Sequence, residues 1–301
     1  MSFKNALKNL VAHFGAVWSL LLYIVIFAAV ISGLSLPFVM PVARAFADAG
    51  VFELFRNSFA SIFGGEGLNG LWNGLYDTYK AVGQVFTDAP KIAALTRSFV
   101  IFIVVLLFRF FLGLYEIPFA TVIDGQLSSN ARFGLGGKFF STLTVSVRYS
   151  LCKLPYTVAF DLLIFSAVYG LGHALGMSIA LPFAVMLVML VLLSLRFSVV
   201  ACWAPSVASG ERGVPKGFVR SASICFKRFG SIYSTYLMSL MLLFVVGAIV
   251  ALLTLGVGMI IVLPFSAAYI SYLNATVFYV KTGKRFYVDG EVVTPSTENV
   301  M

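Results

Sequence analysis

The fold is decided by residues 231–280, which read SIYSTYLMSLMLLFVVGAIVALLTLGVGMIIVLPFSAAYISYLNATVFYV and contain no charged side chain. A helix of about 20 residues crosses the hydrocarbon core of a bilayer, which is about 30 Å thick. The stretch is too long for one crossing, and Gly256 and Gly258 lie at its centre. We therefore expect two membrane helices, 231–256 and 258–280, joined by a turn at these glycines.

Four other apolar stretches have the length of a membrane helix. The pair within 154–204 is expected to divide near Gly170, Gly172 and Gly176. The stretch that follows Lys4 and Lys8 is longer than the apolar region of a secretory signal, which has about 7–15 residues, so we expect a retained helix. The six predicted spans are 14–42, 98–122, 154–176, 177–204, 231–256 and 258–280.

The composition agrees with a membrane protein. Of the 301 residues, 60% are hydrophobic and 11% are charged, whereas soluble domains average about 25% charged residues. We predict an all-α polytopic membrane fold, with a single membrane domain over 1–301. The net charge of +9 is interpreted as membrane orientation charge and not as a nucleic-acid interface.

The distribution of basic residues predicts the orientation. Most of the 21 basic residues fall on one side of the six-span arrangement, in the segments that include 132–153 and 212–230. The opposite side holds five, all in the loop 44–97, where five acidic residues balance them. Because cytoplasmic loops carry the excess of Lys and Arg, both termini are expected in the cytoplasm of a bacterial inner membrane. The inner basic stretches can also hold anionic lipid headgroups.

The outer loop 44–97 has helical periodicity of its own. Phe52, Phe55, Phe59 and Phe63 form one stripe at helical spacing, and a second stripe runs from Leu68 to Phe86. The two stripes are separated by Gly64, Gly65 and Gly67. We predict an extracytoplasmic insertion of two amphipathic helices that lie on the outer surface or cap the bundle.

Short similarities within the chain indicate an internal repeat. Residues 3–15 (FKNALKNLVAHFG) align without gaps on residues 218–230 (FVRSASICFKRFG). The spacing from Arg109 through Pro118 to Asp124 equals the spacing from Arg196 through Pro205 to Glu211, and Asn274 to Asp289 has the same interval. We predict three pseudo-repeated helical hairpins, with units at about 1–125, 138–211 and 217–290, and a short cytoplasmic tail at 291–301.

Several of these motifs also carry a family resemblance. The segments 196–198 (RFS), 204–207 (APSV), 217–221 (GFVRS) and 227–230 (KRFG) resemble a group of bacterial membrane proteins that are similar to the membrane domain of glycerophosphodiester phosphodiesterases. The resemblance covers about 190–290 well and the rest loosely. It implies a membrane fold and no phosphodiesterase activity, since the catalytic domain has no counterpart here.

Polar residues within the spans are the candidates for a site. A charge at bilayer depth costs roughly 2.5–3.5 kcal/mol on insertion scales, so such residues should face the bundle interior and find partners. They can form an anion or headgroup site, or they can be structural pairs that fix the register of the repeats. Prolines 118, 155, 182, 205 and 264 can break spans at a binding site, or lie harmlessly near helix ends. The candidate residues are Arg109, Glu116, Asp161, Arg196 and Asn274.

The remaining motifs give no sign of catalysis. Cys152, Cys202 and Cys225 form no CxxC pair, and His13 and His173 lie in different segments, so we predict no metal and no cofactor. HExxH, GxSxG and Walker A motifs are absent, and we predict no enzyme. The leading hypothesis is a transport or transport-accessory protein for a small amphiphile or lipid. The alternative is a non-transporting scaffold or envelope assembly partner that binds another membrane protein or a second copy of itself.

Overall fold

The computed structural model of the chain describes residues 2–64, 67–131, 134–176, 178 and 180–295. Within these ranges, six helical segments are long and apolar enough to cross a membrane, and they overlap the six predicted spans. The fold is therefore that of an all-α polytopic membrane protein. The segments are Gly15–Asp48, Pro90–Ser129, Leu135–Leu175, Leu181–Ala208, Phe229–Leu253 and Met259–Thr282.

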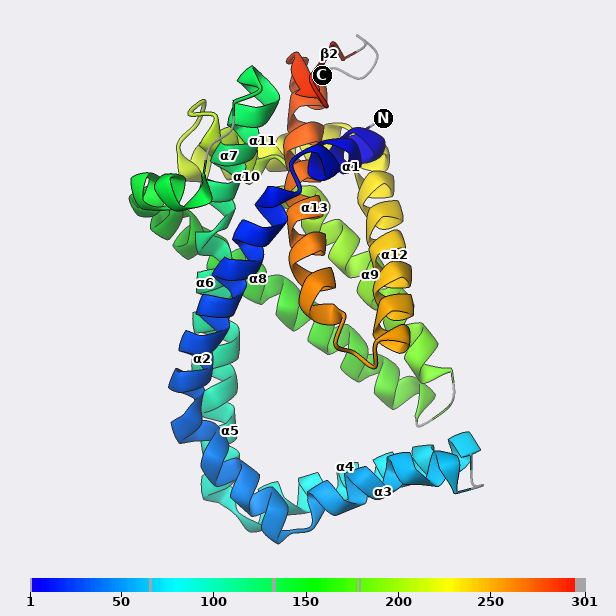
Figure 1. Cartoon of the computed structure of the whole chain (residues 1–301). Helices are drawn as coiled ribbons and strands as arrows, with labels where there is room; N and C mark the ends of the chain where they lie inside the picture. The colour runs from blue at the N-terminus through cyan, green and yellow to red at the C-terminus, as the bar shows by residue number, and fades with distance from the viewer. Residues whose placement is uncertain (1, 65–66, 132–133, 177, 179, 296–301) are drawn as a thin grey trace. The chain divides into compact units, whose positions relative to one another are not determined.

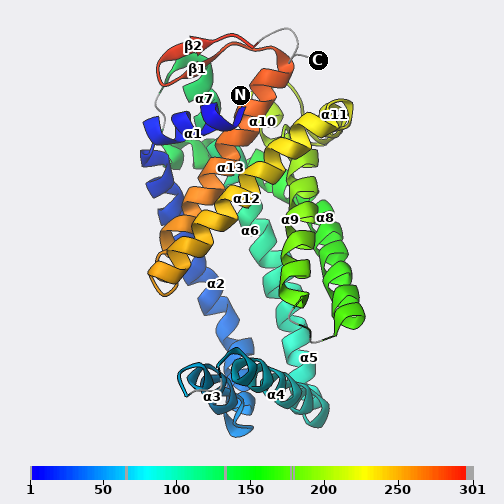
Figure 2. The same ribbon diagram turned by 90° about the vertical axis from the view of Figure 1, so that its right-hand side faces the viewer.

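The uncharged stretch 231–280 forms a helical hairpin, as predicted. Helix α12 (Phe229–Leu253) turns at the central glycines and returns as α13 (Met259–Thr282) (Figure 2). Gly256 has a φ of 88°, which side chains with a Cβ rarely tolerate. A Cβ on Gly258 would approach Val250 Cγ1 to 2.5 Å. Both glycines are therefore required by the turn.

The turn predicted within residues 154–204 occurs at only one of the three glycines near which it was expected. Helix α8 (Leu135–Leu175) is followed by Gly176, which has φ 57° and ψ −152°, and the chain resumes as α9 (Leu181–Val200). The predicted division near these three glycines is confirmed, with Gly176 at the end of α8 and with Gly170 and Gly172 inside the helix.

Helix α8 is continuous over 41 residues and includes Pro155. From Leu135 onward, the predicted basic stretch 132–153 and the predicted span 154–176 therefore belong to one continuous helix, and Arg132 lies outside the described residues. At 1.5 Å per residue, α8 is about 60 Å long and exceeds the thickness of a bilayer core.

Two of the apolar segments are interrupted before a proline. Helix α6 (Arg109–Leu114) ends one residue before Tyr115, which separates it from α7 (Glu116–Ser129), and Pro118 lies in the first turn of α7. Helix α9 likewise ends before α10 (Trp203–Ala208), whose first turn contains Pro205. Proline is tolerated in a first turn because its missing N–H has no helical partner there. Pro118 and Pro205 therefore lie where a span is interrupted, Pro155 and Pro264 lie inside continuous helices, and Pro182 lies at the start of α9. That the interruptions form a binding site stays a prediction.

The chain forms two compact units, Met1–Val25 with Arg109–Met301, and Ile26–Phe108. The sequence does not reveal this division, because one boundary lies inside α2 (Gly15–Asp48) and no polar linker marks either boundary. The predicted repeat units are not tested by the division and stay predictions.

The first unit has its core around α7, α13 and the N-terminal helix α1 (Ser2–Ala12), with helix α11 (Val214–Lys227) packed beside α10. The predicted tail 291–301 begins with the second strand of a hairpin that the sequence analysis did not predict. The hairpin consists of β1 (Phe286–Val288) and β2 (Glu291–Val293). Residues 296–301 lie outside the described part. Asn9 of α1 donates to Tyr287 O and accepts from Asp289 N, both at 3.2 Å. These bonds hold the first helix and the last strands together (Figure 1).

The second unit contains the predicted pair of amphipathic helices, α3 (Val51–Phe63) and α4 (Gly67–Asp88), followed by α5 (Pro90–Phe99) and the π-helical segment η1 (Val100–Phe108). Helices α3 and α4 pack closely, since a Cβ on Gly74 would approach Ser58 Oγ to 2.4 Å. Phe52, Phe55 and Phe59 are about half exposed, so the phenylalanine stripe is not the surface that meets α4. Gly65 and the side chains of Phe63 and Leu68 lie outside the described part.

Candidate functional site

Three of the five candidate residues form one ion cluster, the arginine triad. Arg109 Nε lies 2.9 Å from Asp161 Oδ2, and Arg196 Nη1 lies 2.9 Å from Asp161 Oδ1. The carboxylate of α8 thus bridges a guanidinium of α6 and a guanidinium of α9. The hydroxyl of Tyr156 donates to the backbone oxygen of Arg196 at 2.7 Å, which adds a second link between α8 and α9.

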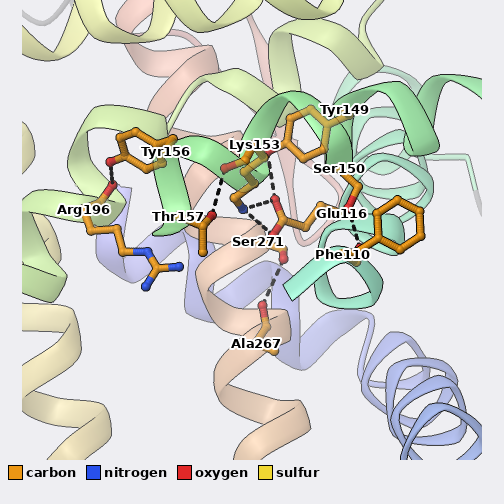
Figure 3. Close-up of polar contacts among 10 residues, drawn as sticks. All are labelled: Phe110, Glu116, Tyr149, Ser150, Lys153, Tyr156, Thr157, Arg196, Ala267 and Ser271. Atoms are coloured by element: carbon orange, nitrogen blue, oxygen red, sulfur yellow. Dashed lines mark hydrogen bonds and ion pairs between the residues drawn. The ribbon is translucent and has the colours of Figure 1, made fainter. Parts of the chain in front are cut away.

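Glu116 forms a separate cluster, the Glu116–Lys153 pair. The Lys153 ammonium makes an ion pair with the Glu116 carboxylate, and Tyr149 donates a hydrogen bond to Glu116 Oε2 at 2.8 Å. Lys153 was assigned to the inner basic stretch at the sequence level and was missed as a site residue. Figure 3 shows Tyr149, Lys153 and Glu116 meeting between two helices.

Both clusters depend on one polar face of α8. Tyr149, Lys153, Thr157 and Asp161 recur every four residues, and residues at this interval lie on the same side of a helix. Such a stripe inside an apolar segment is the sequence signal that identifies Lys153 and Tyr149.

The contact between α6 and α8 brings the partners within reach. Gly113 faces Ser150, and a Cβ on this glycine would approach Ser150 Oγ to 2.4 Å. The Ser150 hydroxyl donates to the backbone oxygen of Phe110. Because Gly113 has no side chain, α6, which carries Arg109, can lie directly against the polar face of α8. Glu116, just beyond the end of α6, reaches the same face.

The Glu116–Lys153 pair lines a cavity of about 210 Å³ between α7, α8, α9, α10 and α13. Asn274, the fifth candidate, lines the same cavity, and its side-chain oxygen accepts a hydrogen bond from Tyr236. The three residues of the arginine triad are not part of the described lining. Further polar lining is supplied by Tyr115, Tyr149, Ser266 and Ser271.

A third ion cluster, the Glu211 cluster, lies outside the apolar segments. Glu211 makes ion pairs with Arg220 of α11 and with Lys284 beyond the end of α13. Burial raises the pKa of Glu211, but the hydrogen bonds from Lys284 and Arg220 outweigh burial and hold the pKa below its ordinary value. Asp124, a further acid of the predicted repeat, accepts a hydrogen bond from the Tyr279 hydroxyl at 2.8 Å.

The cavity is suited to binding a polar group. Within the described ranges, no three His, Cys, Asp or Glu side chains lie close enough to hold a metal ion. One carboxylate, one ammonium and several amide or hydroxyl groups can instead receive a small polar group that carries both charges, because each end finds an opposite charge. A volume of about 210 Å³ equals the liquid volume of about seven water molecules.

Comparison of the chain with protein-family models, with curated proteins and with solved structures gave no match. The resemblance to the membrane domain of glycerophosphodiester phosphodiesterases therefore stays a prediction.

Proposed function

We propose that this membrane protein handles a small amphiphile or lipid, as a transporter or as the accessory of one, and that it is not an enzyme. The observation that carries the proposal is the cavity lined by Glu116, Lys153 and Asn274 between apolar helices. Charged side chains at bilayer depth carry a free-energy cost. A cavity wall of apolar side chains would avoid this cost, so the presence of Glu116 and Lys153 in the wall favours a binding role.

The proposed ligand has a small zwitterionic polar group and an apolar tail. Without a ligand, Glu116 and Lys153 neutralise each other. A zwitterionic group would exchange this one ion pair for two, with its cation at Glu116 and its anion at Lys153. The cavity of about 210 Å³ has room for such a group but not for a whole lipid, so the tail would remain in the bilayer.

We also propose that both termini face the cytoplasm of a bacterial inner membrane, with the helices α3 and α4 outside. The bonds of Asn9 to Tyr287 and Asp289 support termini on one side, as six crossings require. The excess of basic residues near these ends supports the cytoplasmic side. The matching helix interruptions after Arg109 and Arg196 support the proposed repeat of helical hairpins.

The second candidate is a non-transporting scaffold. The arginine triad favours it, since these charges are paired with one another and do not line the cavity. Repeated ion pairs of this kind can fix how helices pack.

The test is to extract the protein from native membrane and identify the molecules that copurify by mass spectrometry. The double variant Glu116→Gln with Lys153→Met removes the cavity charges, and Glu211→Gln with Lys284→Met makes the same changes outside the spans. We expect an amphiphile on the wild type and on the control variant, reduced at least tenfold on the cavity variant. Equal recovery from all three would contradict the cavity site, and a stoichiometric protein partner without any amphiphile would favour the scaffold.

A further inference from the structure

A second cavity lies farther along α13, toward the C-terminal end of this helix, and shares no described lining residue with the cavity of the Glu116–Lys153 pair. It is a groove of about 810 Å³ between α1, α12 and the C-terminal end of α13. Lys281 of α13 lines this groove, and only 6% of the residue is exposed. Its closest polar partner is Ser231 Oγ, at 3.3 Å from the ammonium nitrogen.

The buried ammonium of Lys281 lacks a counter-ion in the described part of the chain. The ion pairs there involve Asp161, Glu116 and Glu211, and none includes Lys281. A buried charge is costly unless an opposite charge pairs with it. An anion bound in the groove would pair with the Lys281 ammonium and remove this cost.

The start of α12 adds backbone hydrogen-bond donors at the same place, while the hydroxyls of Ser234 and Thr235 donate to the backbone oxygen of Ser231. This helix begins at Phe229, and its residues Ser231, Ser234 and Thr235 line the groove. The first N–H groups of a helix have no helical partner and carry partial positive charge, which favours phosphate-type anions.

The groove becomes apolar farther along α12. Met238, Leu242 and Val245 form its wall beyond the hydroxyl-bearing turn. Thr235 and Val245 are separated by about 15 Å along the helix axis. Methionine side chains adapt to irregular partners such as an acyl chain. One end of the groove therefore suits an anion, and the other end suits a hydrocarbon chain. The distance between the two ends fits within the depth of one bilayer leaflet.

We infer that this groove is a binding site for an anionic phospholipid. The phosphate would lie between Lys281 and the first turn of α12, and one acyl chain would follow Met238, Leu242 and Val245. The site uses none of the residues of the Glu116–Lys153 cavity, so the inference does not rest on the proposed function. It also differs from the basic stretches 132–153 and 212–230, because no described residue of these stretches lines the groove.

The test is lipid retention in native mass spectrometry, after purification from nanodiscs of equal parts phosphatidylglycerol and phosphatidylcholine. We expect the wild type to retain phosphatidylglycerol preferentially, and Lys281→Gln to reduce this retention about tenfold. Lys281→Arg should preserve it, because the charge remains. The control Lys8→Gln removes an exposed cation of α1 outside the groove and should leave retention unchanged.

A second pair of variants tests the acyl end without touching a charge. Val245 and Ile249 are both about half exposed on α12, and only Val245 lines the groove. Val245→Trp should fill the groove and lower retention at least fivefold, whereas Ile249→Trp should have no effect. Equal retention in wild type, Lys281→Gln and Val245→Trp would overturn the inference, and so would displacement of the lipid by inorganic phosphate alone. Loss of lipid from the Glu116→Gln, Lys153→Met variant would overturn the independence of the two sites.

Discussion

Two ion clusters on one helix differ in what surrounds them. Lys153 and Asp161 lie on the same face of α8, eight residues or about 12 Å apart along the axis. The Glu116–Lys153 pair borders a cavity, whereas Asp161 is enclosed between two arginines and does not border it. Figure 3 shows the guanidinium of Arg196 apart from the Glu116–Lys153 pair. A charge within a membrane span therefore indicates a site only when there is also space beside it.

The largest effect is expected from breaking the arginine triad. Asp161→Asn leaves the partly buried Arg109 and Arg196 without their carboxylate, and an unpaired charge at bilayer depth costs roughly 2.5–3.5 kcal/mol. The expected result is little monodisperse protein and a clearly lower melting temperature in detergent. Yield and thermal unfolding of the purified variant measure this.

The matched control removes the whole triad. Replacing Arg109, Asp161 and Arg196 together by leucine leaves no unpaired charge, and such replacements are often neutral or stabilising. We expect this triple variant to fold better than Asp161→Asn and to keep its bound amphiphile. If the triple variant folds and loses the amphiphile, the triad belongs to the binding site and the contrast between the clusters fails.

A smaller effect is expected at the hydroxyl that orients Glu116. Tyr149→Phe removes the hydrogen bond to Glu116 Oε2, and hydrogen bonds to charged groups contribute roughly 1.5–3 kcal/mol. Amphiphile recovery should fall severalfold while the protein remains folded. Tyr169→Phe, at an exposed position of the same helix, should change neither quantity, and an equal loss in both variants would show that the effect is not specific to Glu116.

The close contact of α6 with α8 should affect both clusters at once. Gly113→Ala would place a Cβ against Ser150, and overpacking of this kind typically costs 1–3 kcal/mol. Gly170→Ala is the control, because nothing lies within 4 Å of the added Cβ. We expect a lower melting temperature for the first variant and no decrease for the second. Wild-type stability of Gly113→Ala would mean that the two clusters do not depend on this contact.

The sequence was sufficient for the spans and for most polar residues within them. The length of the uncharged stretches predicts the spans, and the backbone freedom of glycine predicts the turn at Gly256. Both signals are local in the sequence. The pairing of Asp161 with both arginines is not local, since the three residues come from α6, α8 and α9. Lys153 was missed because its charge fits the positive-inside pattern, and only the packing of α7 against α8 reveals Glu116 as its partner. The hairpin β1–β2 is too short to have a recognisable strand pattern.

The smallest effect is expected at the Glu211 cluster, which repeats the arrangement of the triad outside the spans. One carboxylate again lies between two cations, Arg220 and Lys284. Ion pairs near water contribute only about 0–1 kcal/mol, so Glu211→Gln should lower the melting temperature slightly at pH 7. The folded-state pKa of Glu211 is lowered, so the stabilisation is present above the unfolded-state pKa of about 4.3 and is lost as the pH falls through the folded-state value.

The difference in melting temperature between wild type and Glu211→Gln should therefore close when unfolding is measured at successively lower pH below about 4.3. A difference that persists or widens at low pH would show that the carboxylate does not act through its charge. If Glu211→Gln instead lowers the melting temperature at pH 7 as much as Asp161→Asn does, location within a membrane span does not determine how much a bridging carboxylate stabilises the fold. The contrast between the Glu116–Lys153 pair and the arginine triad would then rest only on the cavity beside the Glu116–Lys153 pair.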